Sequence, residues 1–259
     1  MSDPLRLVVE VGNSRWKAGL FAPDASEPVG TVRIALGAAP GPPLTQFLAK
    51  YAPDGFTQPP VLAGVHPDAA RALQSAWPSS AGPAPRELPR ATLEGLIDNL
   101  TRQPRRVGTD RLLNALGAAA IAPPGASHLA VADCGTATTV DCVERVSETE
   151  IAFCGGAILP GAVLCARALH AHTAALPEVS FGSDLSEDGL DTKSAIRRGI
   201  SVMQVAAVEQ LLGEAAGPNA FPLLTGGAAS LIAGRLRKTK PLVVPHLTLL
   251  GLFLAAEAA

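Results

Sequence analysis

Residues 8–14 read Val-Val-Glu-Val-Gly-Asn-Ser, and residues 131–137 repeat the pattern as Val-Ala-Asp-Cys-Gly-Thr-Ala. Each stretch runs from apolar residues through an acid and any one residue to glycine and a small polar residue. The two acids, Glu10 and Asp133, are separated by nearly half of the 259-residue chain. An acid-x-Gly turn after a strand is common, but a repeat at this spacing is typical of two related halves. We therefore predict a duplicated architecture.

The segments around these turns carry strand and helix patterns in alternation. Apolar runs at 5–11 and 16–21 flank the first turn and predict a strand, a tight turn and a second strand. Further strands are expected at 30–36, 61–65, 129–132, 222–224 and 242–244, with β-type residues continuing from the second turn to Val143. Helices are expected at 45–51, 67–77, 111–121, 192–212 and 248–258, and after Gly161 to about Ala171. This mixture predicts an α/β fold.

Composition restricts the class of protein. Hydrophobic residues make up 47% and charged residues 17% of the chain, which argues against disorder. The net charge of −2 and the 4% aromatic content give no basis for binding nucleic acid or an anionic membrane. No signal-peptide pattern is visible, and the apolar stretch 247–256 is too short to span a bilayer. We expect a cytoplasmic protein with four buried, reduced thiols, Cys134, Cys142, Cys154 and Cys165.

The first turn has the residues of a phosphate site. Gly12 allows close backbone approach, Asn13 and Ser14 supply polar groups, and Lys17 supplies a positive charge. Glu10 at the strand end could hold Mg²⁺ directly or through water. The alternative is an ordinary hairpin turn.

The second turn has a comparable set of polar residues, namely Asp133, Thr136 and Asp141. Carboxylates gathered around phosphates require cations, because like charges otherwise repel. Placed opposite the first turn, this set would form the other side of a nucleotide cleft. Alone, Asp133 is equally well explained as a turn-capping residue.

Residues 108–111 read Gly-Thr-Asp-Arg and stand just before a predicted helix. One interpretation is that Thr109 or Asp110 caps the helix N-terminus. The other is that Asp110 serves as a general base while Arg111 clamps an anionic substrate. Later in the chain, Thr225-Gly226-Gly227 is either a surface for a flat base or a strand-to-helix turn that needs glycine.

Taken together, these motifs resemble the type III pantothenate kinases of the acetate kinase/actin/Hsp70 superfamily. The resemblance covers nearly the whole chain. It is carried by 10–17, 108–111 with Asn114, 133–141, 155–161, Leu176-Pro177, Thr192, Gly199, 225–227 and Gly251-Leu252.

The resemblance implies two ribonuclease-H-like halves, as in actin-like ATPases, with a nucleotide cleft between them. Residues 1–120 would carry the first phosphate loop and the Gly-x-Asp-Arg motif. Residues 121–259 would carry the second phosphate loop and the adenosine-side Thr-Gly-Gly. The implied reaction is ATP-dependent phosphorylation of pantothenate to 4′-phosphopantothenate, the first step of coenzyme A biosynthesis, by a homodimer.

The resemblance also implies roles for single residues. ATP would contact Glu10, Val11, Gly12, Asn13, Ser14, Arg15, Trp16, Lys17 and Thr136. Pantothenate would contact Gly108, Thr109, Asp110, Arg111 and Thr192, with Asp110 accepting the proton of the substrate hydroxyl. Asp133 would hold a monovalent cation, K⁺ or NH₄⁺, and Glu10 could hold the Mg²⁺ that accompanies ATP.

Two positions depart from the family pattern. The first phosphate motif usually opens with Asp, where this chain has Glu10, and a Tyr usually precedes the Gly-x-Asp-Arg motif, where this chain has Thr101. The extra methylene of Glu10 moves its carboxylate by about 1.5 Å. Two alternatives to the pantothenate kinase follow. One is a kinase of the same superfamily for another small hydroxyl substrate, and the other is a catalytically weak relative that acts as a regulatory or accessory binding protein.

Overall fold

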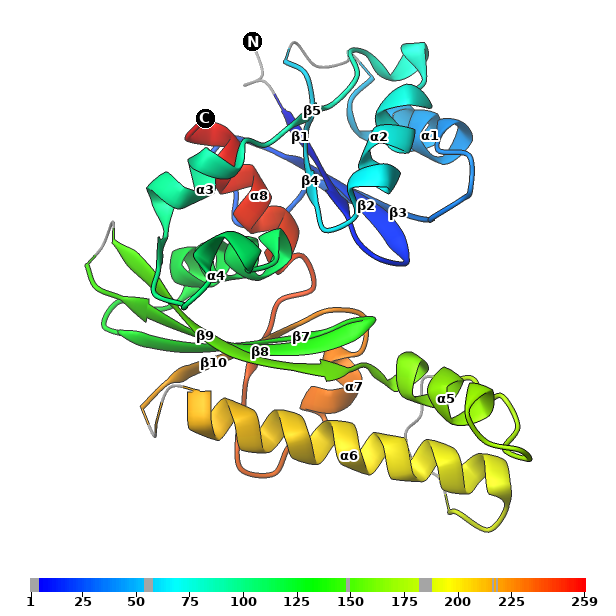
Figure 1. Cartoon of the computed structure of the whole chain (residues 1–259). Coiled ribbons are helices and arrows are strands. Elements are labelled where there is room, and N and C mark those ends of the chain that lie inside the picture. Colours follow the sequence, from blue (N-terminus) through cyan, green and yellow to red (C-terminus); the bar gives the residue numbers. More distant parts are fainter. Residues whose placement is uncertain (1–4, 54–57, 148–149, 182–187, 216, 218) are drawn as a thin grey trace. The chain divides into compact units, whose positions relative to one another are not determined.

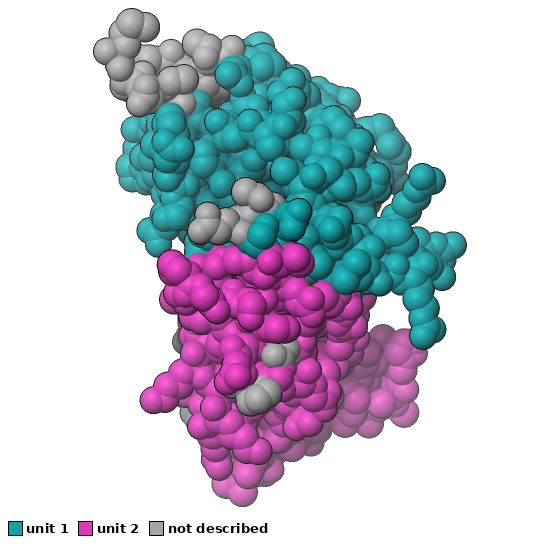
Figure 2. Space-filling model, turned by 90° about the vertical axis from the view of Figure 1, so that its left-hand side faces the viewer, with its two compact units in different colours: residues 1–121, 147–153, 246–259 teal, residues 122–146, 154–245 magenta. Residues whose placement is uncertain are grey.

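The computed structural model describes residues 5–53, 58–147, 150–181, 188–215, 217 and 219–259, which form helices around two mixed β-sheets (Figure 1). The chain divides into two compact units (Figure 2). Unit 1 comprises Met1–Ile121, Ser147–Phe153 and His246–Ala259, and unit 2 comprises Ala122–Val146 and Cys154–Pro245. No helix within the described ranges combines the length and the apolarity needed to cross a membrane.

Unit 1 contains a five-stranded sheet in the order β3-β2-β1-β4-β5. Its strands are β1 (Arg6–Val11), β2 (Arg15–Phe21), β3 (Gly30–Ala35), β4 (Val61–Gly64) and β5 (Arg86–Glu87). The central strand β1 runs antiparallel to β2 and parallel to β4, and all its residues are buried. Leu7, Val9 and Val11 share one hydrophobic core with α1 (Gly41–Tyr51) and α2 (Pro67–Ser75). A strand buried on both faces explains why Leu7, Val8 and Val9 are consecutive apolar residues.

The remaining helices of unit 1 centre on the pair α4 (Thr109–Ile121) and α8 (Leu247–Glu257). The two helices touch closely at Gly251, where an added Cβ would lie 1.9 Å from the Leu113 carbonyl oxygen. Phe253 of α8 stacks on Phe21 of β2 with ring centroids 4.7 Å apart. The pair is preceded by α3 (Arg90–Leu96), β6 (Asp98–Asn99) and the 3₁₀ turn η2 (Pro104–Arg106).

Unit 2 carries β7 (His128–Cys134), β8 (Ala137–Arg145), β10 (Phe221–Thr225) and β11 (Leu242–Val243). The strand β9 (Ile151–Pro160) passes from unit 1 into unit 2, and the whole sheet has the order β11-β10-β7-β8-β9-β6. The helices of unit 2 are α5 (Ala162–Ala171), α6 (Thr192–Ala215) and α7 (Ala229–Ala233). The core under α6 and α7 includes Ala130, Val208 and Leu224.

The two sheets repeat one topology, as the duplicated motif predicts. In each, the acid-bearing strand runs antiparallel to the next strand in the chain and parallel to a later one. Glu10 is in register with Ala63 of β4, and Asp133 is in register with Thr225 of β10. The expected α/β fold is therefore confirmed.

The compact units differ from a division at residues 120 and 121 because Ser147–Phe153 and the C-terminal helix both belong to unit 1. Helix α8 belongs to unit 1, because it packs on α4 and on β1. Sequence patterns also gave no sign of α3, β5 and β6, which are short and lack a full period of apolar residues.

Candidate active site

The first predicted phosphate turn joins β1 to β2. Glu10 is only 8% exposed and is in register with Lys17, whose Nζ donates to Glu10 Oε2 at 2.9 Å. The Gly12 N–H donates to the Arg15 carbonyl at 2.9 Å and closes the hairpin. An ordinary hairpin turn explains this backbone, but it does not require a partly buried ion pair beside it.

The other residues of this turn divide by exposure. Asn13, Ser14 and Arg15 are exposed, whereas the side chains of Val11 and Trp16 lie in the core of unit 1. The side chains of Val11 and Trp16 are therefore not accessible to a nucleotide.

Asp110 lies in the first turn of α4, and so does Thr109, so neither is the residue before the helix. The Arg111 backbone N–H donates to Asp110 Oδ1 at 2.9 Å. Burial raises the pKa of the Asp110 carboxyl, and the charge of Glu10 raises it further, while the Arg111 N–H and guanidinium oppose the shift. A carboxylate with a raised pKa is better matched to accepting a proton near neutral pH.

Arg111 is placed by an aromatic ring. Its guanidinium carbon lies 5.2 Å from the ring centroid of Phe153, which belongs to the part of β9 in unit 1. A guanidinium over an aromatic face gains a cation–π interaction, and this contact orients the Arg111 side chain. No local pattern in the sequence indicates that Phe153 contacts Arg111, because Phe153 lies 42 positions after Arg111.

The second predicted turn lies in unit 2, between β7 and β8. The Gly135 N–H donates to the Ala137 carbonyl at 3.0 Å, which parallels the bond at Gly12. Gly226 has φ +94°, and a Cβ there would lie 2.4 Å from Asp133 Oδ1. The Thr225-Gly226-Gly227 turn therefore packs directly on Asp133, and only glycine fits at the point of contact.

The glycine-rich end of β9 supports the same turn. The Gly161 N–H donates to the Thr136 carbonyl at 3.0 Å. Thr136 itself is exposed, and Asp141 is fully buried within β8. Asp141 therefore belongs to the interior of the sheet, whereas the Thr136 side chain lies at the surface.

Two further positions that the sequence analysis singled out lie at the start of α6 and in the loop before α4. Thr192 is the exposed first residue of α6, whose start is capped by Asp191 Oδ1 accepting from the N–H groups of Lys193 and Ser194. The Thr101 hydroxyl donates to Asn99 Oδ1 at 2.7 Å, and this hydrogen bond stabilises the loop before α4.

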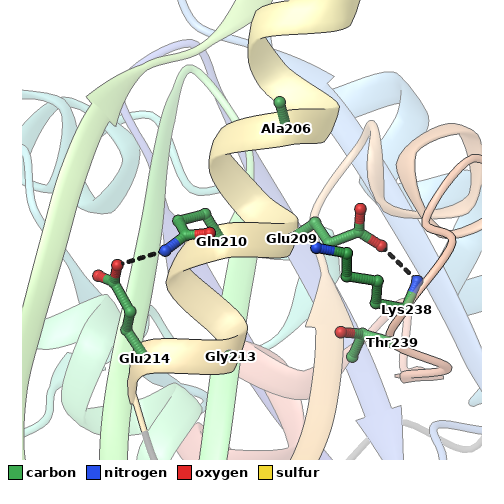
Figure 3. Close-up of a pocket in the computed structure, with 7 residues that line it drawn as sticks. All are labelled: Ala206, Glu209, Gln210, Gly213, Glu214, Lys238 and Thr239. Carbon is green, nitrogen blue, oxygen red and sulfur yellow. Dashed lines mark hydrogen bonds between the residues drawn. The ribbon is translucent and has the colours of Figure 1, made fainter.

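A small pocket of about 80 Å³ in unit 1 is lined by Ala63, Gly64, Glu87, Leu88, Arg90, Leu93 and Thr109. A larger one of about 430 Å³ lies in unit 2 between α6 and the segment 238–239 (Figure 3). There Glu209 Oε1 accepts from the backbone N–H groups of Arg237 and Lys238. This carboxylate fastens a loop to α6, and the pocket contains none of the predicted site residues.

The described part of the chain contains no group of three or more His, Cys, Asp or Glu side chains that could hold a metal ion. All four cysteines are free, but only Cys134 is buried, and Cys142, Cys154 and Cys165 are half-buried. The expectation of four buried thiols is therefore wrong for three of them. Burial raises the pKa of the Cys134 thiol to about 12, which leaves it protonated and unreactive.

Comparison with known proteins assigns the family. The family model described as type III pantothenate kinase matches residues 6–214. The chain belongs to the type III pantothenate kinase family. A type III pantothenate kinase of Synechococcus elongatus is 31% identical over 261 residues, which cover 98% of this chain and 97% of the relative. The Thermus thermophilus enzyme is 34% identical over 235 residues, with 87% and 88% covered.

Other members of the type III pantothenate kinase family match over a shorter range. The Janthinobacterium enzyme is 40% identical over 169 residues, so the match spans 62% of this chain and 62% of the relative's length.

The fold is confirmed by solved structures. A Campylobacter jejuni protein described as a Baf family transcriptional activator has a TM-score of 0.57 at 18% identity, with 97% of each chain covered. Component A of (R)-2-hydroxyglutaryl-CoA dehydratase from Acidaminococcus fermentans has a TM-score of 0.54 at 15% identity, with 99% of each covered. The chain thus has the α/β fold of actin-like ATPases.

Proposed function

We propose that this protein transfers the γ-phosphoryl group of ATP to the hydroxyl of pantothenate, producing 4′-phosphopantothenate for coenzyme A biosynthesis. The proposal rests on family membership and on one observation above the others. The Asp110 carboxylate has a raised pKa at the start of α4, and its neighbour Arg111 is a cation suited to the carboxylate of pantothenate.

The reaction needs one proton acceptor and good positioning. As the substrate oxygen forms its bond to the γ-phosphorus, its proton passes to Asp110, the bond from that phosphorus to the bridging oxygen breaks, and ADP leaves. Charge in such a loose transition state lies mostly on the phosphoryl oxygens. A partly buried carboxylate therefore suffices as the base, and the backbone of Gly108 and Thr109, together with Thr192, would bind the substrate.

The nucleotide would bind at the two turns. The exposed Asn13, Ser14 and Arg15, with the backbone of 10–17, would contact the phosphates from unit 1, and Thr136 would contact ATP from unit 2. Lys17 is paired with Glu10 at 2.9 Å and would keep that carboxylate from repelling the phosphates.

We propose that the protein uses one divalent and one monovalent cation. Mg²⁺ is usually held by one or two carboxylates together with substrate phosphates, so Glu10 is sufficient without a larger cluster. When bound, Mg²⁺ would neutralise charge on the phosphates. Asp133, against the Gly226 backbone, would hold K⁺ or NH₄⁺.

We also propose that the protein is a homodimer in the cytoplasm. Within each chain, residues 1–120 and 121–259 would form the two functional halves. Large apolar side chains are exposed on α5 and α6, namely Val163, Leu164, Leu169, Val202 and Met203. Exposed apolar side chains of this size become buried when a partner covers them, and we propose that the partner is a second copy of the chain.

The deciding assay is ADP release by the purified protein with ATP, Mg²⁺ and pantothenate, with K⁺, NH₄⁺ or Na⁺ as the only monovalent cation. We expect pantothenate-dependent turnover with K⁺ or NH₄⁺ and much less with Na⁺. ADP release with another small alcohol but not with pantothenate would assign a different substrate. ATP binding without turnover on any alcohol would favour an accessory binding protein.

A further inference from the structure

The segment between α3 and α4 leads directly into the turn of α4 that carries Asp110, yet it has little regular structure. Residues 102–106 are all exposed, and the only regular elements between Ile97 and Thr109 are β6 and η2. A loop with few buried apolar contacts opens at low free energy unless polar contacts hold it. The polar contacts of this loop therefore decide how well the residues that follow it are positioned.

Arg90 supplies two of these contacts from the first turn of α3. Its Nη1 donates to the Val107 carbonyl at 3.0 Å, and its Nη2 donates to the Pro104 carbonyl at 2.9 Å. The two carbonyls lie at the two ends of η2. Because a guanidinium is planar with donors in a rigid fork, both carbonyls are held in one geometry. Glu94, one turn along α3, lies 3.6 Å from Arg90 Nε and orients the side chain.

Asn99 adds a third point of attachment. Its Nδ2 donates to the same Pro104 carbonyl at 3.1 Å, and its Oδ1 accepts from the Thr101 hydroxyl at 2.7 Å. Thr101 stands where related kinases usually have Tyr. The loop is thus tied at 101, 104 and 107 to side chains outside η2, and Arg90 holds the last two.

The attachment reaches Asp110 through one tight contact. Val107 is followed by Gly108, and a Cβ on Gly108 would lie 2.5 Å from Asp110 Oδ1. The carboxylate therefore rests against the Gly108 backbone, and the Gly108 carbonyl accepts from the Leu112 N–H as α4 begins. A shift of the Val107 carbonyl moves Gly108, and a shift of Gly108 moves the carboxylate.

We infer that Arg90 is a positioning residue for phosphoryl transfer: it fixes the loop 100–108 and thereby the carboxylate of Asp110. The inference rests on the proposed function for its kinetic part. Arg90 also lines the small pocket that includes Thr109, which places its side chain beside the proposed substrate motif. A misplacement of about 1 Å costs a reaction up to ~100-fold in rate.

The test compares Arg90→Ala and Arg90→Lys with Arg105→Ala, which removes an exposed arginine from η2 itself. We expect Arg90→Ala to lower kcat by about 10- to 100-fold, with a smaller change in the KM for ATP. Arg90→Lys should recover part of the loss, because an ammonium reaches one carbonyl but not two. Added ethylguanidinium should raise kcat for Arg90→Ala and leave Arg105→Ala unchanged.

A second readout does not depend on turnover. Hydrogen–deuterium exchange should become faster across 100–112 in Arg90→Ala and remain as in the wild type in Arg105→Ala. Unchanged exchange together with unchanged kcat would overturn the inference, as would equal effects of Arg90→Ala and Arg105→Ala. A fall in melting temperature without rescue by ethylguanidinium would also overturn it, because that result indicates a structural role only. If the wild type lacks pantothenate-dependent turnover, the proposed function fails, and exchange alone decides whether Arg90 orders the loop.

Discussion

The Asp110 carboxylate rests against the backbone of Gly108, so closely that a Cβ at Gly108 would lie 2.5 Å from Asp110 Oδ1. Both residues belong to one short motif, but their relationship is set by the turn that begins α4. Glycine at this position is therefore a condition for placing the proposed base.

Replacing Gly108 by Ala should displace the carboxylate. We expect kcat to fall by about 10- to 100-fold, because the methyl group occupies the space of Oδ1. Gly95→Ala is the matched control, since a Cβ there meets nothing within 4 Å. In α3 it should add stability of about 0.5–1 kcal/mol. Steady-state kinetics and thermal unfolding of both variants are the measurements, and a fully active Gly108→Ala enzyme would contradict the geometry.

Asp110→Asn should remove the proton acceptor and leave the fold intact. General-base removal typically costs ~10²- to 10⁴-fold in turnover, and ATP binding should persist. Asp98→Asn, at an exposed position in β6, is the control. ADP release and calorimetric ATP titration test the pair, and wild-type turnover in Asp110→Asn would reject the assigned role.

The same residue predicts a pH dependence of stability. Burial raises the pKa of Asp110 in the folded state, so the folded protein binds this proton more tightly than the unfolded chain does. The stabilising contribution is complete below the unfolded pKa and is lost as pH rises through the folded pKa. The melting temperature of Asp110→Asn, relative to the wild type, should therefore increase from acid to neutral pH. A constant difference across this range would show that the pKa is not raised.

Glu10 should influence the pH profile through its charge. Because the Glu10 carboxylate raises the pKa of Asp110, Glu10→Gln should move the acid limb of kcat/KM to lower pH. Turnover will also fall if Glu10 helps to bind Mg²⁺. The informative quantity is therefore the pH at the midpoint of the acid limb, and not the turnover itself. Glu27→Gln, at an exposed position, should leave the limb in place. A limb unmoved by Glu10→Gln would mean that another group titrates.

Gly251→Ala should destabilise unit 1. The added Cβ would lie 1.9 Å from the Leu113 carbonyl oxygen, and forced repacking of a core typically costs about 1–3 kcal/mol or more. Gly213→Ala in α6 meets nothing within 4 Å and should be neutral or stabilising. Urea unfolding of the two variants measures the difference, and equal stabilities would mean that α4 and α8 lie farther apart.

Much of the architecture follows from local chemistry, and so the sequence predicted it. The acid-x-Gly turns at Glu10 and Asp133, the apolar strand before each and the helix after Gly108 depend on residues within a few positions of one another. The roles suggested for Asp110 and Arg111 also rest on a motif that is continuous in the chain, and they stay predictions.

Only the tertiary structure decided what depends on distant segments. The packing of Gly251 on Leu113, of Phe153 under Arg111 and of Gly226 on Asp133 joins residues far apart in sequence. The bonds from Arg90 to the Pro104 and Val107 carbonyls have backbone acceptors, so no residue type at 104 or 107 reveals them. Close approach between segments and bonds to carbonyls leave no periodic pattern in a sequence, because they arise from the way the chain folds back on itself.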